Sequence, residues 1–297
     1  MTNPFGSDVL TRLRTFLDAE EPQLMRWLVS VWNKQQSAIT YAELREAILN
    51  GYMSVQQLEK WQLDYAKFVN DKLAPAWERA FKAGIANANT AIYDPFTTAM
   101  GEFIQRRGAE LITNMTTEQQ NAIRAMTLHA AYHNELSVDS LARVVRPVIG
   151  LTKPQAVANL NYYNGQVEAH LEAGMTQARA EARAREAAAK YAGRQHRYRA
   201  QNIARTELAY AYNQGSYGGT KDAQLKGFIG DCAKEWLTAA DERVCPTCGS
   251  IEGETVNMDA MFSIGVLLPP AHPSCRCGVA YIQVAEPIGI NTPLANL

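Results

Sequence analysis

The first 215 residues show the spacing of apolar side chains that amphipathic helices require. One such stripe recurs at three- and four-residue intervals and comprises Leu24, Trp27, Leu28, Val31 and Trp32. Residues spaced in this way lie on one face of an α-helix and can be buried together. Later segments repeat the pattern, so it predicts a mainly α fold for this part of the chain.

Polar residues that cap helices indicate where several of these helices begin. A serine or threonine that precedes an apolar-periodic segment can accept a hydrogen bond from the first helical turn, and a glutamate or glutamine three positions later can complete a capping box. The predicted helix starts are Thr40, Ser54, Thr116 or Thr117, Ser137 and Thr152.

The composition changes in the middle of the chain. Residues 166–192 are rich in alanine, glutamate, arginine and glutamine, which predicts a long and mostly solvated helix. Residues 179–205 hold eight basic and two acidic residues. Gly218 and Gly219 are expected to break the helical part.

Three short strands are expected beyond this point, at 234–238, 252–256 and 278–284. The predicted organisation is an N-terminal helical region at 1–150 and a long basic helix with the Arg205-Thr206-Glu207 segment at 151–215. A small α+β module follows at 216–284, and an extended tail is predicted at 285–297.

Charge and composition exclude several classes of protein. The chain has 29 basic and 30 acidic residues and is 47% apolar, values that exclude wholesale disorder. The near-zero net charge argues against a protein that coats nucleic acid along its whole surface. No apolar run reaches the ~18 residues of a membrane span, and no secretory signal is recognisable, so we expect no membrane partner and a reducing compartment.

The cysteines predict a metal site. All five lie after residue 231, and Cys245 and Cys248 have the C-x2-C spacing of a zinc knuckle. Further candidate ligands follow about 25 residues later at His272, Cys275 and Cys277. Structural zinc would use four of these five, with Cys232 a more distant candidate. Free or buried thiols and a catalytic Cys–His pair are the alternatives.

The basic segment offers a second candidate site. Arginines at spacings of three to five could meet phosphates on one side of a helix, and such binding would weaken with salt. The candidates for contact with DNA or a protein partner are Arg183, Arg194, Arg197, Arg199 and Arg205. The alternative interpretation is an ordinary solvated helix face.

Several of these segments together resemble a known family. The segments are Ile203–Glu207, Trp236, Asp241–Cys248, Gly253, Pro269-Pro270 and His272–Cys277. In this combination they resemble the phage Mu F-like minor head proteins, or phage head morphogenesis proteins, from about residue 195 to 284. Within the resembling part, Arg205, Glu207, Trp236, Asp241 and Arg243 are interpreted as structural, forming ion pairs and the turn that presents Cys245.

The resemblance implies a minor head protein of a tailed phage or prophage, without enzymatic activity. Such a protein would bind the portal inside the capsid, with the helical region at 1–150 as the expected portal-binding part, and assist head assembly, DNA packaging or DNA delivery. The implied partners are portal, capsid or scaffold proteins, with DNA as a further candidate, and the implied location is the virion, after assembly in the host cytoplasm. The alternatives are a nucleic-acid-acting enzyme or an effector that uses the Cys/His site.

Overall fold

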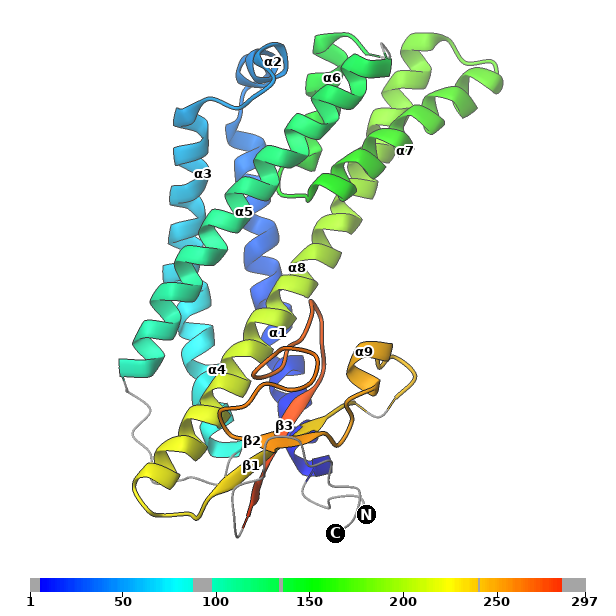
Figure 1. Ribbon diagram of the computed structural model, residues 1–297. Coiled ribbons are helices and arrows are strands. Elements are labelled where there is room, and N and C mark those ends of the chain that lie inside the picture. The colour runs from blue at the N-terminus through cyan, green and yellow to red at the C-terminus, as the bar shows by residue number, and fades with distance from the viewer. Residues whose placement is uncertain (1–5, 88–97, 134–135, 240, 285–297) are drawn as a thin grey trace. The chain divides into compact units, whose positions relative to one another are not determined.

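The computed structural model describes residues 6–87, 98–133, 136–239 and 241–284, and every structural statement below refers to these ranges. The chain is mainly helical, with a three-stranded antiparallel sheet formed by residues near its C-terminal end (Figure 1). This architecture confirms the predicted combination of a mainly α protein and a small C-terminal α+β module. The predicted tail, 285–297, lies outside the described residues.

The helices differ widely in length. In chain order they are α1 (Gly6–Ala38), α2 (Tyr41–Asn50), α3 (Val55–Phe68), α4 (Ala74–Asn87), α5 (Thr98–His133), α6 (Val138–Val145), α7 (Lys153–Glu172), α8 (Gln177–Leu225) and α9 (Pro246–Gly249). A π-helical turn, Val69–Leu73, joins α3 to α4, and a 3₁₀ turn, Arg146–Val148, follows α6. In the described part of the chain, no helix is both long and apolar enough to cross a membrane.

The predicted caps account for the starts of four helices. Thr40, Ser54, Ser137 and Thr152 are the N-cap residues of α2, α3, α6 and α7. The start predicted at Thr116 or Thr117 is wrong, because α5 runs through both positions. The hydroxyl of Thr116 donates instead to the carbonyl of Ile112, one turn earlier, so this threonine is accommodated inside the helix.

The middle of the chain also differs from the expectation. The predicted helix over 166–192 is two helices, because α7 ends at Glu172 and Gly174 adopts φ +82° before α8 begins. One face of α8 is buried rather than solvated, and it is lined by Ala180, Ala184, Ala188, Ala192, Ala200 and Ala204. The expected break at Gly218 and Gly219 is wrong, since α8 continues to Leu225.

The chain forms two compact units, each assembled from separated segments. Unit 1 takes described residues from Met1–Leu24, Leu73–Arg106 and Gln201–Leu297, and unit 2 from Met25–Lys72 and Arg107–Ala200. Helices α1, α5 and α8 contribute residues to both units. These units differ from a sequential division at residues 150 and 215, because each long helix supplies apolar residues to two cores.

A hydrogen-bonded chain of side chains crosses the interior of unit 2. The indole N–H of Trp32 on α1 donates to the hydroxyl of Tyr65 on α3 at 3.1 Å. That hydroxyl donates in turn to Oε1 of Gln119 on α5 at 2.5 Å. All three side chains are buried, so these bonds satisfy polar atoms that would otherwise cost stability. They fix α1, α3 and α5 of this unit against one another.

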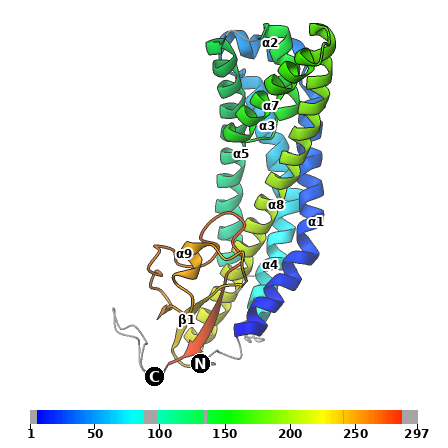
Figure 2. The same ribbon diagram turned by 90° about the vertical axis from the view of Figure 1, so that its right-hand side faces the viewer.

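The sheet and α9 belong to unit 1. Strand β1 (Cys232–Leu237) lies between β2 (Thr255–Asn257) and β3 (Gly278–Gln283). The three strands confirm those expected from the sequence. Figure 2 shows the sheet and α9 on one side of the C-terminal part of α8, with α4 on the other. The module therefore packs on a helix that is buried on more than one side.

Candidate metal centre

Helix α9 positions the first two thiols of the candidate site. Cys245 is the N-cap of this single-turn helix, and Cys248 lies in it. The backbone N–H of Cys248 donates to Sγ of Cys245 at 3.3 Å. This bond is the one that a C-x2-C knuckle uses to stabilise a thiolate, so the local structure agrees with the motif seen in the sequence.

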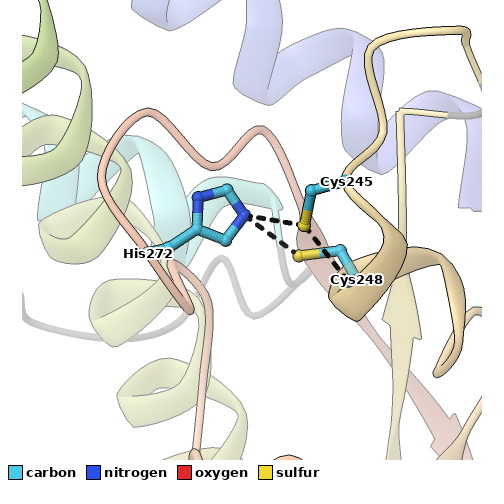
Figure 3. Close-up of side chains that lie close together, drawn as sticks. All are labelled: Cys245, Cys248 and His272. Carbon is cyan, nitrogen blue, oxygen red and sulfur yellow. Dashed lines mark hydrogen bonds between the residues drawn. The ribbon is translucent and has the colours of Figure 1, made fainter.

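His272 points its ring at these two thiols (Figure 3). Its Nε2 atom lies 3.1 Å from Sγ of Cys245 and 3.3 Å from Sγ of Cys248. Its Nδ1 atom lies 2.9 Å from the carbonyl oxygen of Pro273. A carbonyl only accepts, so Nδ1 carries a proton, and Nε2 is the ring nitrogen that faces the two sulfurs. The ring is thus held in the orientation that a metal ligand needs.

Cys275 and Cys277 form a second group of ligands with Cys248. The donor atoms of Cys245, Cys248 and His272 lie within 4.8 Å of one another, as do those of Cys248, Cys275 and Cys277. The sulfurs of Cys248 and Cys275 are 3.8 Å apart. Cys248 therefore belongs to both groups, and the structure brings together all five ligand candidates taken from the sequence. Either group could hold a metal ion.

Cys232, the more distant candidate, lies apart from the cluster. It is buried at the start of β1, and its sulfur lies 3.5 Å from the carbonyl oxygen of Gly230. It belongs to neither ligand group in the described residues. A substitution of Cys232 can therefore serve as the control for substitutions of the other four cysteines.

The local electrostatics favour thiolates at two positions. The N–H of Cys248 lowers the pKa of the Cys245 thiol, and a hydrogen bond from Cys277 lowers the pKa of Cys275 to about 5. Burial and the nearby Cys275 raise the pKa of Cys248 to about 12. Thiolates this close repel one another, and a divalent cation would offset that repulsion. Sulfur and imidazole donors in this number fit zinc.

The space between the ligands is small. A cavity of about 30 Å³ is lined by the four clustered cysteines and His272, together with neighbouring residues such as Val244 and Ser274. A volume of this size accommodates an ion or a single water molecule.

An ion pair fastens the turn that leads into the knuckle. The two terminal guanidinium nitrogens of Arg276 donate to the carboxylate of Asp241, each at 2.6 Å, and the backbone N–H of Arg243 donates to the same carboxylate at 3.0 Å. The Arg276 guanidinium holds the pKa of Asp241 well below its usual range. Since Arg276 lies between two ligand cysteines, this pair connects both halves of the cluster.

The Arg205-Thr206-Glu207 segment lies on α8 within unit 1. The guanidinium of Arg205 donates to both carboxylate oxygens of Glu21 on α1, at 2.7 and 2.8 Å, and Glu21 is buried. Glu207 is also buried. The sequence carried no signal for Glu21 as a partner, because 184 residues separate it from Arg205.

Trp236, another member of the resembling segments, belongs to the apolar core of the module. It is fully buried in β1 and meets Phe262 edge-on, with ring centroids 5.0 Å apart. Cys248, Cys275 and Cys277 are part of the same core cluster. The candidate ligands are therefore also core residues of this module.

The five basic candidates occupy two different environments. Arg183, Arg194 and Arg197 are exposed on α8. Arg199 is buried, where it donates to the carbonyl of Gly150 and pairs with Glu118, while Arg205 is held by Glu21 as described. Of these five side chains, the first three are the ones placed to meet a partner.

Two exposed basic residues extend the set of three. Arg179 lies four residues before Arg183, and Lys190 lies four residues before Arg194, so all four are on the same helix face. Glu186, an acidic residue, lies on this face between Arg183 and Lys190. We call Arg179, Arg183, Lys190, Arg194 and Arg197 the basic stripe. The helical period of these residues could have identified the whole stripe from the sequence.

The fold and the site together define a helical protein with a small sheet module built around a Cys/His cluster. Residues 163–280 match the family model described as phage Mu protein F like protein. The match covers less than half of the chain, and over these residues it confirms the resemblance found in the sequence. No curated protein and no solved structure matches the chain.

Proposed function

We propose that this protein is a minor head protein of a tailed phage or prophage. It binds the portal protein inside the capsid, meets capsid or scaffold proteins, and assists head assembly, DNA packaging or DNA delivery. The match of residues 163–280 to the phage Mu F-like family carries this proposal. The small cavity at the Cys/His cluster is of a size that suits a single ion, which supports a structural role for the cluster.

The head assignment is tested on heads from a phage or prophage that encodes this chain. We expect mass spectrometry to detect the protein at low copy number in purified heads. Co-expression with the portal protein of the same phage should give a complex that co-sediments. Absence from heads together with no portal complex would contradict the proposal.

The Cys/His cluster is proposed to bind one structural Zn²⁺. Its ligands are four of Cys245, Cys248, His272, Cys275 and Cys277, and the ion would hold α9 to the loop that leads into β3. Three short strands bury little apolar area, so a metal would supply stability that the module's core lacks. Zinc would act by cross-linking these two segments and not by activating a substrate.

Metal content of the purified chain tests this site. We expect one zinc per chain in the wild type and in Cys232→Ser, and its loss in Cys248→Ser, because Cys248 belongs to both ligand groups. Cys232→Ser is the matched control, since this buried thiol lies in neither group. Retention of zinc by Cys248→Ser would assign the ion to the four remaining candidates, whereas a wild-type chain without metal under reducing conditions would overturn the zinc assignment.

The basic stripe is proposed as the surface of α8 that meets DNA. Its five cationic side chains recur along one helix face, opposite the alanines buried in unit 2, with Glu186 as the acidic member. Tyr198 is exposed next to Arg197. Cations in this arrangement can follow a phosphate backbone without reading its sequence.

Salt dependence of DNA binding tests the stripe. Replacing Arg183, Arg194 and Arg197 by glutamine should weaken binding to a duplex of mixed sequence and reduce the slope of log K against log salt by as much as about 3, since each lost phosphate contact removes about 0.9. The control variant removes three exposed charges elsewhere, at Arg26, Arg124 and Lys153. Equal losses in both variants would show that the stripe is not the contact surface.

A further inference from the structure

Ser274 occupies a special position in the candidate metal centre. It lies between the candidate ligands His272 and Cys275 and adopts φ 59°, a left-handed conformation that a non-glycine residue rarely takes. The backbone at Ser274 sets the direction in which the chain continues from His272 to Cys275. The N–H of Cys275 donates to the carbonyl of His272 at 3.1 Å, which closes this turn. A residue in this conformation needs contacts that hold it there.

Two side chains of α8 supply those contacts. The backbone N–H of Ser274 donates to Oγ1 of Thr206 at 2.9 Å, and the Ser274 hydroxyl donates to Oδ1 of Asn202 at 2.6 Å. The Thr206 hydroxyl donates to the carbonyl of Asn202 at 2.6 Å, so it uses both its donor and an acceptor site. We call Asn202, Thr206 and Ser274 the clasp.

The helix that carries the clasp is itself fixed at this point. Arg205, next to Thr206, is bound through two hydrogen bonds to the buried carboxylate of Glu21 on α1. The clasp therefore connects the loop of the second ligand group to a helix that cannot shift without breaking a buried ion pair. All these residues belong to unit 1.

We propose that Asn202 and Thr206 are positioning residues for the metal centre, and that metal binding and closure of the clasp stabilise each other. This inference rests on the proposed metal site. The clasp holds the turn that places His272 and Cys275, so it reduces the ordering that a metal must otherwise impose on the loop. Coupling of this kind is reciprocal, so loss of the metal loosens the contact between the loop and α8.

Zinc affinity of two Thr206 variants tests the first half of the inference. Competition with a chromophoric chelator should show zinc binding at least about 10-fold weaker in Thr206→Val, which keeps the side-chain shape but loses the hydroxyl. Thr206→Ser keeps the hydroxyl and should bind within about twofold of the wild type. Equal affinity in wild type and Thr206→Val would overturn the inference while leaving the zinc site intact.

Hydrogen exchange tests the reciprocal half. In the wild type, removal of zinc should speed amide exchange in 270–277, including the Ser274 N–H, and in the part of α8 around 202–206. In Thr206→Val the same amides should exchange fast with or without zinc. A merely structural role for Thr206 would not make exchange at 202–206 depend on zinc, so exchange that is insensitive to zinc contradicts the coupling.

If Thr206→Val fails to fold, a second variant tests the role of the clasp in zinc binding. Ser274→Gly removes the side chain whose hydroxyl bonds Asn202, and glycine adopts φ 59° without strain. We expect it to fold and to bind zinc several-fold more weakly, whereas wild-type affinity would count against the clasp. A wild-type chain that binds no zinc would refute the metal proposal itself, a result distinct from failure of the coupling.

Discussion

Individual polar residues hold the turn between α6 and α7 in the interior of unit 2. The carbonyl of Ile149 accepts from the side-chain amide of Gln36 at 3.0 Å and from Nε2 of His196 at 2.8 Å. The ring of His196 also packs on Trp32, with centroids 5.3 Å apart. Burial lowers the pKa of His196 to about 4, so the ring is neutral in the folded protein.

This histidine predicts a pH dependence of stability. As the pH falls from 6.5 towards 4, the unfolded chain takes up a proton at His196 that the folded chain does not, so stability falls over this range and changes little with this group below it. The loss should be about 2 kcal/mol between pH 7 and pH 5. Urea unfolding of wild type and His196→Gln at both pH values isolates the contribution, and parallel losses in the two proteins would refute it.

Residue-level patterns predicted the members of the Cys/His cluster better than they predicted the contacts that support it. The C-x2-C spacing and the His-x2-Cys-x-Cys segment placed all five candidate ligands, because short spacings constrain side chains directly. Glu21, Arg14 and Asn202 could not be found in this way. Arg14 donates to the carbonyl of Ala239 at 2.6 Å across 225 positions of sequence, and no local pattern records such a distant contact.

Among the elements, α4 and α8 of unit 1 approach each other unusually closely. A Cβ atom on Gly215 would lie 2.1 Å from the carbonyl oxygen of Phe81, and one on Gly84 would lie 1.9 Å from that of Tyr212. Neither backbone oxygen can move aside easily. Gly215 of α8 and Gly84 of α4 therefore allow these two helices to pack closely.

Glycine-to-alanine substitutions test the close packing of α4 against α8. Gly215→Ala should destabilise unit 1 by about 2–3 kcal/mol, because the added methyl overlaps the backbone of α4. Gly101→Ala in α5 is the matched control, since a methyl group at this position would have no neighbouring atom within 4 Å, and it should stabilise by up to about 1 kcal/mol. Thermal unfolding distinguishes the two, and a Gly215→Ala protein as stable as wild type would contradict the packing argument.

Helix starts were predictable where the capping residue bonds only to residues of the first helical turn. Thr40 and Thr152 form capping boxes with the acidic or amide residue three positions on, and such bonds depend on the sequence alone. Element ends and continuations depended on packing instead. Thr116 and Gly218 have the composition of helix boundaries, but each lies inside a long helix whose neighbours stabilise it.

At the scale of the whole molecule, the two units differ in how far their cores depend on the proposed metal. The core of the sheet module contains Cys248, Cys275 and Cys277 among its eight buried residues. Unit 2 has its own core and, within the described ranges, no residue of the Cys/His cluster. Neither unit follows the order of the chain, and their interleaving was not predictable from local periodicity, which does not specify which distant segments pair.

Chelation is expected to affect the two units unequally. Removing zinc should make the segment between Cys245 and Cys277 sensitive to limited proteolysis, because its small core loses the cross-link. The far-UV circular dichroism of the chain should change little, since most helical residues lie outside that segment. Mass spectrometry of the fragments checks the prediction, and cleavage that begins within 107–133 or 153–172 would contradict it.

Cys248 belongs to both groups of donors, so five donors surround the four positions that zinc uses. A zinc ion in the proposed site would have a fifth donor at hand to replace one that it releases. A competing thiol would then replace the donors one at a time, and the rate of ion exchange would rise with the concentration of that competitor. In the proposed centre, tight binding would therefore be compatible with rapid exchange of the ion.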